Sequence, residues 1–179
     1  MRYASIRSMD ISNGEGVGIS LFVQGCHFHC KNCFNKDTWD FNGGKEWTQE
    51  IEDEFIKLAN KPHIKRISIL GGEPLADENL DGILNLVNKI RLLMPEKTIW
   101  LYTGYRFDDE ECWVKPKNDI GNLFRFMRQE IIKNVNIVVD GRYIDSQRDI
   151  SLCWRGSKNQ RVIDVKESLK QNKVVLYCD

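Results

Sequence analysis

Residues 19–33 read Ile19-Ser20-Leu21-Phe22-Val23-Gln24-Gly25-Cys26-His27-Phe28-His29-Cys30-Lys31-Asn32-Cys33, an apolar run followed by a short loop with three cysteines. The run predicts a buried strand over residues 17–23. Thiolates this close together repel one another unless they bind a metal or form disulfides. Three is an odd number for disulfides and one short of a closed tetrahedral zinc site. Three thiolates suit a [4Fe–4S] cluster with one iron left open to a substrate.

A structural zinc ion is the alternative interpretation of the same loop. His27 and His29 flank Phe28 between the first two cysteines, and either histidine would supply the fourth ligand. The choice between cluster and zinc therefore depends on what the rest of the chain places near the loop.

The composition is that of an ordinary globular chain without a marked charge. The 179 residues are 41% apolar and 29% charged, and 26 basic side chains balance 26 acidic ones. A neutral chain has no electrostatic reason to favour nucleic acid or anionic lipid, so we expect neither as a partner. The sequence shows no secretory signal and no membrane-spanning run. We expect one cytoplasmic domain over residues 1–179, with its six cysteines serving metal binding rather than disulfides.

Apolar runs alternate with helical periodicity along the chain. Further buried strands are predicted at residues 66–70, 98–102 and 135–139. Thr48 is the expected N-cap of a helix that follows the first strand, and Asp77 is the expected cap of the next helix. A third helix is marked by Leu123, Phe124, Met127 and Ile131. Strand and helix thus alternate three times, which predicts an α/β fold with a parallel sheet.

The two ends of the chain have weaker patterns. Residues 1–15 show a mixed pattern that ends in the turn-rich Asn13-Gly14-Glu15-Gly16. Extra strands are possible at residues 162–165 and 174–177, with a short helix over 165–171. A polar insertion covers residues 106–118.

Each further polar motif follows a predicted strand. Gly71-Gly72-Glu73-Pro74 follows the second strand, Thr103-Gly104-Tyr105 the third and Asp140-Gly141-Arg142 the fourth. Ligands of parallel α/β sheets bind at the carboxyl ends of the strands, so these loops should meet the cysteine loop at one rim. A zinc ion in the cysteine loop would leave the other three loops without a role.

These motifs resemble those of the radical S-adenosylmethionine (SAM) superfamily. Cys26-x3-Cys30-x2-Cys33 is similar to its cluster motif, and Gly71-Gly72-Glu73-Pro74 resembles its SAM-binding turn. More narrowly, the chain resembles the family that activates the anaerobic ribonucleoside-triphosphate reductase, from about Asn13 to Val165. The stretches that carry this likeness are Asn13-Gly14-Glu15-Gly16-Val17, Phe22-Val23-Gln24-Gly25-Cys26, Cys33-Phe34-Asn35 with Thr38-Trp39, Tyr102-Thr103-Gly104-Tyr105, Val139-Asp140-Gly141-Arg142, and Arg155-Gly156-Ser157 through Asn159-Gln160-Arg161.

The resemblance implies a fold, an activity and partners. The fold would be an open partial (β/α) barrel in a single domain. Cys26, Cys30 and Cys33 would ligate one [4Fe–4S] cluster, and SAM would chelate the fourth iron through its amino and carboxylate groups. Reductive cleavage of SAM would give a 5′-deoxyadenosyl radical that abstracts hydrogen from a glycine of the reductase, which leaves a glycyl radical. A low-potential donor such as flavodoxin would supply the electron, and no catalytic residue is expected beyond the cluster and SAM.

The resemblance also implies a set of residues that bind the cofactor. Glu73 would accept a hydrogen bond from the SAM ammonium group, and the alternative is an ordinary strand-to-helix turn, which the neighbouring cysteine triad disfavours. Phe34 would stack on adenine, and the alternative is a core phenylalanine. Many superfamily members place the aromatic residue before the last cysteine, where this chain has Asn32. The full expected set is Asn32, Cys33, Phe34, Gly71, Gly72, Glu73, Thr103, Asp140 and Arg142.

Several alternatives remain open at the level of sequence. Thr103, Asp140 and Arg142 would contact the methionine and ribose of SAM, or else form a turn with a surface salt bridge. Trp39 is expected to pack rather than to take part in chemistry. Cys112, Cys153 and Cys178 lack metal-like spacing and are expected to be isolated thiols. The rival functions are activation of another glycyl-radical enzyme and a metal-stabilised interaction module.

Overall fold

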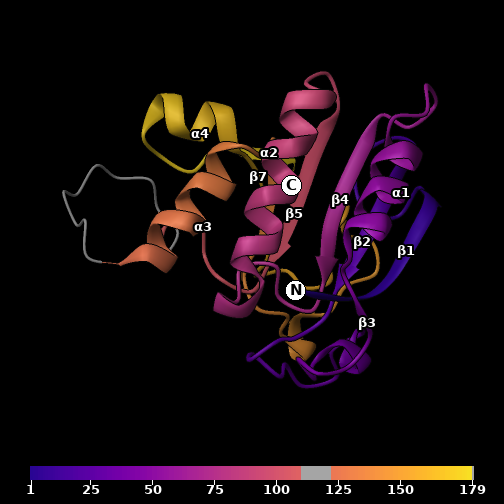
Figure 1. The fold of residues 1–179 in the computed structure, drawn as a ribbon. Helices are drawn as coiled ribbons and strands as arrows, with labels where there is room; N and C mark the ends of the chain where they lie inside the picture. Colours follow the sequence, from indigo (N-terminus) through magenta and orange to yellow (C-terminus); the bar gives the residue numbers. More distant parts are fainter. Residues whose placement is uncertain (110–121, 179) are drawn as a thin grey trace.

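The computed structural model describes residues 1–109 and 122–178 and shows one mixed sheet with helices packed on it (Figure 1). The strand order is β3-β1-β2-β4-β5-β6-β7-β8. Residues 110–121 and 179 lie outside the described residues. Cys112 and most of the insertion predicted at 106–118 therefore lie outside them too.

The centre of the sheet is parallel, as the alternation of strand and helix predicts. Its strands are β2 (Gly18–Val23), β4 (Arg66–Gly71), β5 (Thr98–Thr103) and β6 (Ile137–Asp140). Neighbouring strands in this order pair parallel along their length. All four strands predicted from apolar runs are confirmed, because strands buried on both faces must be apolar almost throughout.

The helices bury one amphipathic face against the sheet. They are α1 (Gln49–Ala59), α2 (Leu80–Leu93), α3 (Leu123–Lys133) and α4 (Val165–Gln171). Figure 1 shows α1, α2 and α3 on the same side of the sheet. Thr48 is the N-cap of α1, where its hydroxyl accepts a hydrogen bond from the Ile51 amide. The predicted helices are confirmed, although Leu123 and Phe124 of α3 are exposed rather than buried.

The expected capping role of Asp77 is wrong. Asp77 begins a short 3₁₀ turn that ends at Asn79, and its carboxylate accepts a hydrogen bond from Arg128 of α3 instead. Asn79 precedes α2, and its side-chain amide donates to the main-chain oxygens of Gln24 and Glu73, both at 3.0 Å. A long-range ion pair and a contact to the rim thus replace the local cap.

The outer strands run antiparallel and were only partly expected. They are β1 (Arg2–Asp10), β3 (Lys45–Glu46), β7 (Arg161–Asp164) and β8 (Leu176–Cys178). β1 pairs with β2 and with β3, while β7 pairs with β6 and with β8. The sheet is therefore parallel only at its centre. The two extra strands and the short helix suggested near the C-terminus are confirmed.

The sheet stays open across the described residues, with β3 and β8 as its outermost strands. The α/β class and the open architecture are confirmed, and curvature of the radical SAM barrel type stays a prediction. Within the described chain, no helix combines the length and apolar character that a membrane crossing would need.

The face of the sheet opposite the main helices carries a buried arginine. Arg66 is 0% exposed, and its guanidinium donates to the main-chain oxygen of Asp10 at 2.6 Å and to the Asp10 carboxylate at 3.2 Å. Gly14 lies over this group with φ +127°, and a Cβ there would lie 2.6 Å from Arg66 and 2.7 Å from the Trp100 ring. The turn-rich segment after β1 is thus fixed on a buried ion pair.

Candidate functional site

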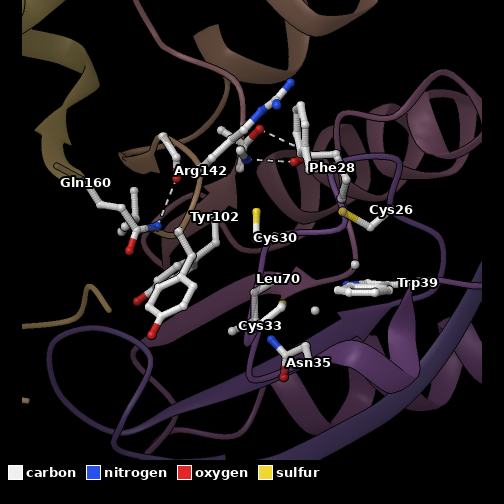
Figure 2. A pocket seen from close by; sticks show the side chains of 18 residues that line it. Cys26, Phe28, Cys30, Cys33, Asn35, Trp39, Leu70, Tyr102, Arg142 and Gln160 are labelled. Atoms are coloured by element: carbon white, nitrogen blue, oxygen red, sulfur yellow. Dashed lines mark hydrogen bonds between the residues drawn. The ribbon is translucent and has the colours of Figure 1, made fainter. Parts of the chain in front are cut away.

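The carboxyl ends of the four parallel strands meet at one pocket, as predicted (Figure 2). The cysteine loop forms one wall, and the turns after β4, β5 and β6 form the others. Its lining residues are Cys26, Phe28, Cys30, Cys33, Asn35, Trp39, Leu70, Gly71, Gly72, Glu73, Tyr102, Thr103, Gly104, Val139, Gly141, Arg142, Tyr143 and Gln160.

All three cysteines of the loop line this pocket as free, half-buried thiols. Left-handed backbone at His29 (φ 44°) and Asn32 (φ 57°) turns the loop, and the Cys33 amide donates to the Cys30 oxygen at 3.0 Å. Burial, with the nearby Glu73 charge, raises the pKa of Cys26 to about 11. Burial and the neighbouring Cys33 also raise the pKa of Cys30. Thiolates at these positions therefore need a cationic partner, and this donor set fits an iron–sulfur cluster.

The histidines of the loop do not complete a zinc site. His27 contacts the Glu78 carboxylate at 2.9 Å, and His29 stacks on Trp39 with ring centroids 4.6 Å apart. Among residues 1–109 and 122–178, no group of three His, Cys, Asp or Glu side chains could hold a single metal ion. A four-iron cluster binds each cysteine at a separate iron, so its ligands need not converge on one point.

The Gly71-Gly72-Glu73-Pro74 turn lies directly against the start of the cysteine loop. The Glu73 amide donates to the Gly25 oxygen at 2.7 Å, and the Gly72 amide donates to the Val23 oxygen at 2.9 Å. A Cβ on Gly72 would lie only 2.3 Å from the Gly25 oxygen, and Gly71 has φ +108°. Glycine is therefore required for this approach, which fixes the turn beside Cys26 through main-chain atoms alone.

Glu73 is buried at the centre of the rim, with 2% of its surface exposed. Its carboxylate accepts from the Leu75 amide at 2.9 Å, the Thr103 hydroxyl at 2.7 Å and the Gly104 amide at 2.7 Å. Burial raises the pKa of Glu73 to about 7, although these hydrogen bonds favour the ionised form. Thr103 thus holds the Glu73 carboxylate by a hydrogen bond, and its hydroxyl oxygen also accepts a hydrogen bond from the Tyr105 amide at 3.1 Å.

Asp140 and Arg142 lie in different environments. Asp140 is fully buried, does not line the pocket, and accepts from Arg161 Nε at 3.0 Å and from the Phe107 amide at 2.8 Å. Arg142 is exposed and lines the pocket with its guanidinium carbon 4.3 Å from the centre of the Phe28 ring. A surface salt bridge between Asp140 and Arg142 is therefore wrong, because Arg161 is the partner of the acid.

Asn32 and Phe34 lie outside this pocket, at a neighbouring groove that also includes Cys33. The Asn32 amide donates to the Asp145 carboxylate at 2.9 Å. Phe34 is 94% exposed, so its interpretation as a core residue is wrong. Its stacking on adenine stays a prediction.

Gln160 is a pocket residue whose role the sequence did not reveal. Its side-chain oxygen accepts from the Gly156 amide at 2.9 Å and the Ser157 amide at 3.1 Å, and its amide donates to the Gly141 oxygen at 2.9 Å. Arg155-Gly156-Ser157 and Asn159-Gln160-Arg161 show only a family likeness in the sequence, because their contact with the turn after β6 depends on the fold.

Phe28 and Tyr143 were also missed as lining residues. Phe28 lies inside the cysteine motif, and Tyr143 directly follows the Asp140-Gly141-Arg142 motif, so nearness to these motifs was the available signal. Among the described residues, Cys153 and Cys178 form no disulfide, and neither lines the pocket.

Comparison with known proteins agrees with this geometry. Residues 12–163 match a family model described as a 4Fe-4S single cluster domain. A relative from Escherichia coli K12 is 38% identical over 90% of this chain and 97% of its own length, and it is named anaerobic ribonucleoside-triphosphate reductase-activating protein. Relatives with the same name occur in Vibrio cholerae, at 36% identity over 89% of this chain and 96% of their own, and in phage T4, at 34% over 90% and 93%.

The fold and the three-cysteine rim therefore define a 4Fe-4S single cluster domain. Within that class, the chain belongs to the family of anaerobic ribonucleoside-triphosphate reductase-activating proteins.

Proposed function

We propose that this chain, acting as a single domain, activates an anaerobic ribonucleoside-triphosphate reductase by radical SAM chemistry. Cys26, Cys30 and Cys33 would hold a [4Fe–4S] cluster, which with bound SAM and one electron from an external donor would supply methionine and a 5′-deoxyadenosyl radical, and this radical would remove a hydrogen atom from a glycine of the reductase. The main observation in support is that the glycine-rich turn is held against the start of the cysteine loop by main-chain contacts. The family names of the relatives support the choice of partner.

The residues of the chain bind and orient the cofactor in this proposal. Gly71 and Gly72 would let main chain approach SAM, and the Glu73 carboxylate would accept a hydrogen bond from the SAM amino group. Thr103 fixes Glu73 in place. Arg142, over the Phe28 ring, offers a cation to the same pocket.

The remaining residues of the expected set act from the margins of the pocket. Asp140, the last residue of β6, accepts a hydrogen bond from Arg161 of β7 and so fixes the end of the strand. Asn32, through Asp145, holds the loop at Cys33, and exposed Phe34 covers the adenine.

The protein partners enter through the open side of the site. An open sheet does not enclose a small substrate, but it admits a segment of another protein that completes a water-excluded pocket. Glycine suits such a segment because its Cα carries no side chain and can approach closely. The electron comes from a low-potential donor of the flavodoxin type.

Isotope transfer tests the proposed reaction. With the reductase labelled by deuterium at its glycine Cα positions, one deuterium should appear in 5′-deoxyadenosine per glycyl radical formed. The measurement is mass spectrometry of the nucleoside beside spin counting by electron paramagnetic resonance (EPR). Accumulation of unlabelled 5′-deoxyadenosine while the label stays in the partner would contradict direct abstraction from glycine.

Replacing Glu73 by Gln should weaken SAM binding while the cluster still assembles. Losing a charge-assisted hydrogen bond costs about 1.5–3 kcal/mol, which raises the Kd roughly tenfold to a hundredfold. Glu78→Gln is the matched control, because Glu78 contacts exposed His27 and lies outside the pocket.

The same carboxylate should make SAM binding depend on pH. The pKa of Glu73 is raised to about 7, so the SAM amino group meets a neutral acid below that pH and a carboxylate above it. SAM affinity should therefore fall as the pH drops below about 7, and this dependence should be absent in Glu73→Gln. Equilibrium dialysis across pH measures both effects. Equal affinity of the two proteins above about pH 7 would show that Glu73 does not bind SAM.

A further inference from the structure

Trp39 forms part of the wall of the cysteine pocket. It lines the pocket together with Cys26, Cys30 and Cys33, and Figure 2 shows its indole close to Cys26. The sequence predicted only a packing role for this residue. Its ring does pack, because it stacks on His29 with centroids 4.6 Å apart and an interplanar angle of 23°.

The indole N–H of Trp39 has no hydrogen-bond partner in the part of the chain that the structure describes. Its Nε1 atom is buried, and none of these residues accepts a hydrogen bond from it. An indole nitrogen can only donate, so the group needs an acceptor to offset its loss of water. The pocket that Trp39 lines also holds the three sulfur atoms that we assign to the cluster.

The main chain holds Trp39 in a fixed relation to the first cysteine. The Cys26 amide donates to the Trp39 oxygen at 3.0 Å, and the Gly25 amide donates to the Thr38 oxygen at 2.7 Å. The buried side chain of Gln24 donates to the main-chain oxygens on either side, those of Asp37 at 3.0 Å and Asp40 at 2.8 Å. The segment that carries the indole is therefore anchored to the residues that lead into the cluster loop.

We infer that the Trp39 indole N–H donates a hydrogen bond to a sulfur of the [4Fe–4S] cluster, either a cysteine thiolate or an inorganic sulfide, and thereby raises its reduction potential. This inference rests on the proposed cluster. Reduction places additional negative charge on the sulfur atoms, so a donor stabilises the reduced form more than the oxidised form. Trp39 thus makes the cluster easier to reduce by a donor of limited reducing power.

The test compares two tryptophan variants of the full-length, anaerobically reconstituted protein. Trp39→Phe keeps an aromatic ring against His29 but removes the N–H donor. Trp47→Phe is the control, because the Trp47 indole donates to Glu52 at 3.0 Å and does not line the pocket. EPR-monitored redox titration should give a more negative midpoint potential for Trp39→Phe and an unchanged one for Trp47→Phe, with equal iron and sulfide contents. Equal potentials in all three proteins would overturn the inference.

A second measurement needs no change at Trp39. When tryptophan is labelled with ¹⁵N in the indole ring, pulsed EPR of the reduced protein should show a ¹⁵N hyperfine coupling. The coupling should persist in Trp47→Phe, and its absence from the unmodified protein would overturn the inference even if Trp39→Phe fails to assemble a cluster.

Iron and sulfide analysis of the unmodified protein distinguishes failure of the proposed function from failure of the inference about Trp39. Failure to bind a four-iron cluster would remove the proposed function and this inference with it. An intact cluster without the coupling and without the shift in potential would remove this inference alone.

Discussion

Alanine at any one of Cys26, Cys30 or Cys33 is expected to abolish the four-iron cluster and all cleavage of SAM. Each thiol lines the same pocket, and each would bind a different iron, so none can replace another. The His27 and His29 rings contact Glu78 and Trp39 and are not placed as substitute ligands. Anaerobic reconstitution followed by iron and sulfide analysis, absorbance, and chromatography of 5′-deoxyadenosine measures the loss.

The control replaces the other three cysteines together. A chain with Cys112, Cys153 and Cys178 all changed to Ala should still bind about four iron atoms and cleave SAM. Cys153 and Cys178 do not line the pocket. Loss of iron from this triple variant would show that the ligands have been assigned to the wrong residues.

Replacing the buried Arg66 is expected to cause a large loss of folding stability. Arg66→Met should lower the free energy of unfolding by about 3–5 kcal/mol, since it leaves buried Asp10 with only Arg7, on the surface, as a charged partner. The loss also frees the main-chain oxygen of Asp10, at the end of β1, and that of Gly16 in the segment that follows. Urea unfolding under anaerobic conditions, followed by circular dichroism, gives this value.

Arg7→Met is the matched control because Arg7 pairs with the same acid from the surface. Its guanidinium lies 3.7 Å from the Asp10 carboxylate, and its side chain is 51% exposed. Exposed pairs contribute at most about 1 kcal/mol. Equal losses in the two variants would show that burial of Arg66 is not what makes its ion pair important.

The central strands and the cysteine rim could be predicted because their signals are local. A buried parallel strand must be apolar on both faces, so the run over residues 17–23 is visible without knowledge of its neighbours. β1 gives no such signal, since most of its residues are partly or fully exposed and its pairing of Tyr3 with Val23 joins distant parts of the chain.

The pairing of Asp140 shows why side-chain roles are harder to predict than elements. Asp140 and Arg142 are two residues apart, which suggested that they act together. Gly141, with φ +95°, turns the chain between them, so the two side chains lie in different environments. Arg161 lies opposite Asp140 in the antiparallel register of β6 and β7, and that register depends on the assembled sheet.

The same distinction applies to Glu73 and Asp77. Their positions after a strand and before a helix were clear from the sequence. Their partners come from separate elements, Thr103 at the end of β5 and Arg128 on α3, and could not be inferred from spacing.

The contact between Gly25 and the turn at Gly72 and Glu73 has a consequence for how such a protein can diverge. This junction is made from peptide groups, so it does not depend on the side chains around it. Substitutions at Phe28, Tyr143 or Gln160 should therefore leave its geometry unaltered. Selection can then adapt the side chains that line the pocket to a different protein partner. The main-chain contact between the cysteine loop and the glycine-rich turn stays the same during this change.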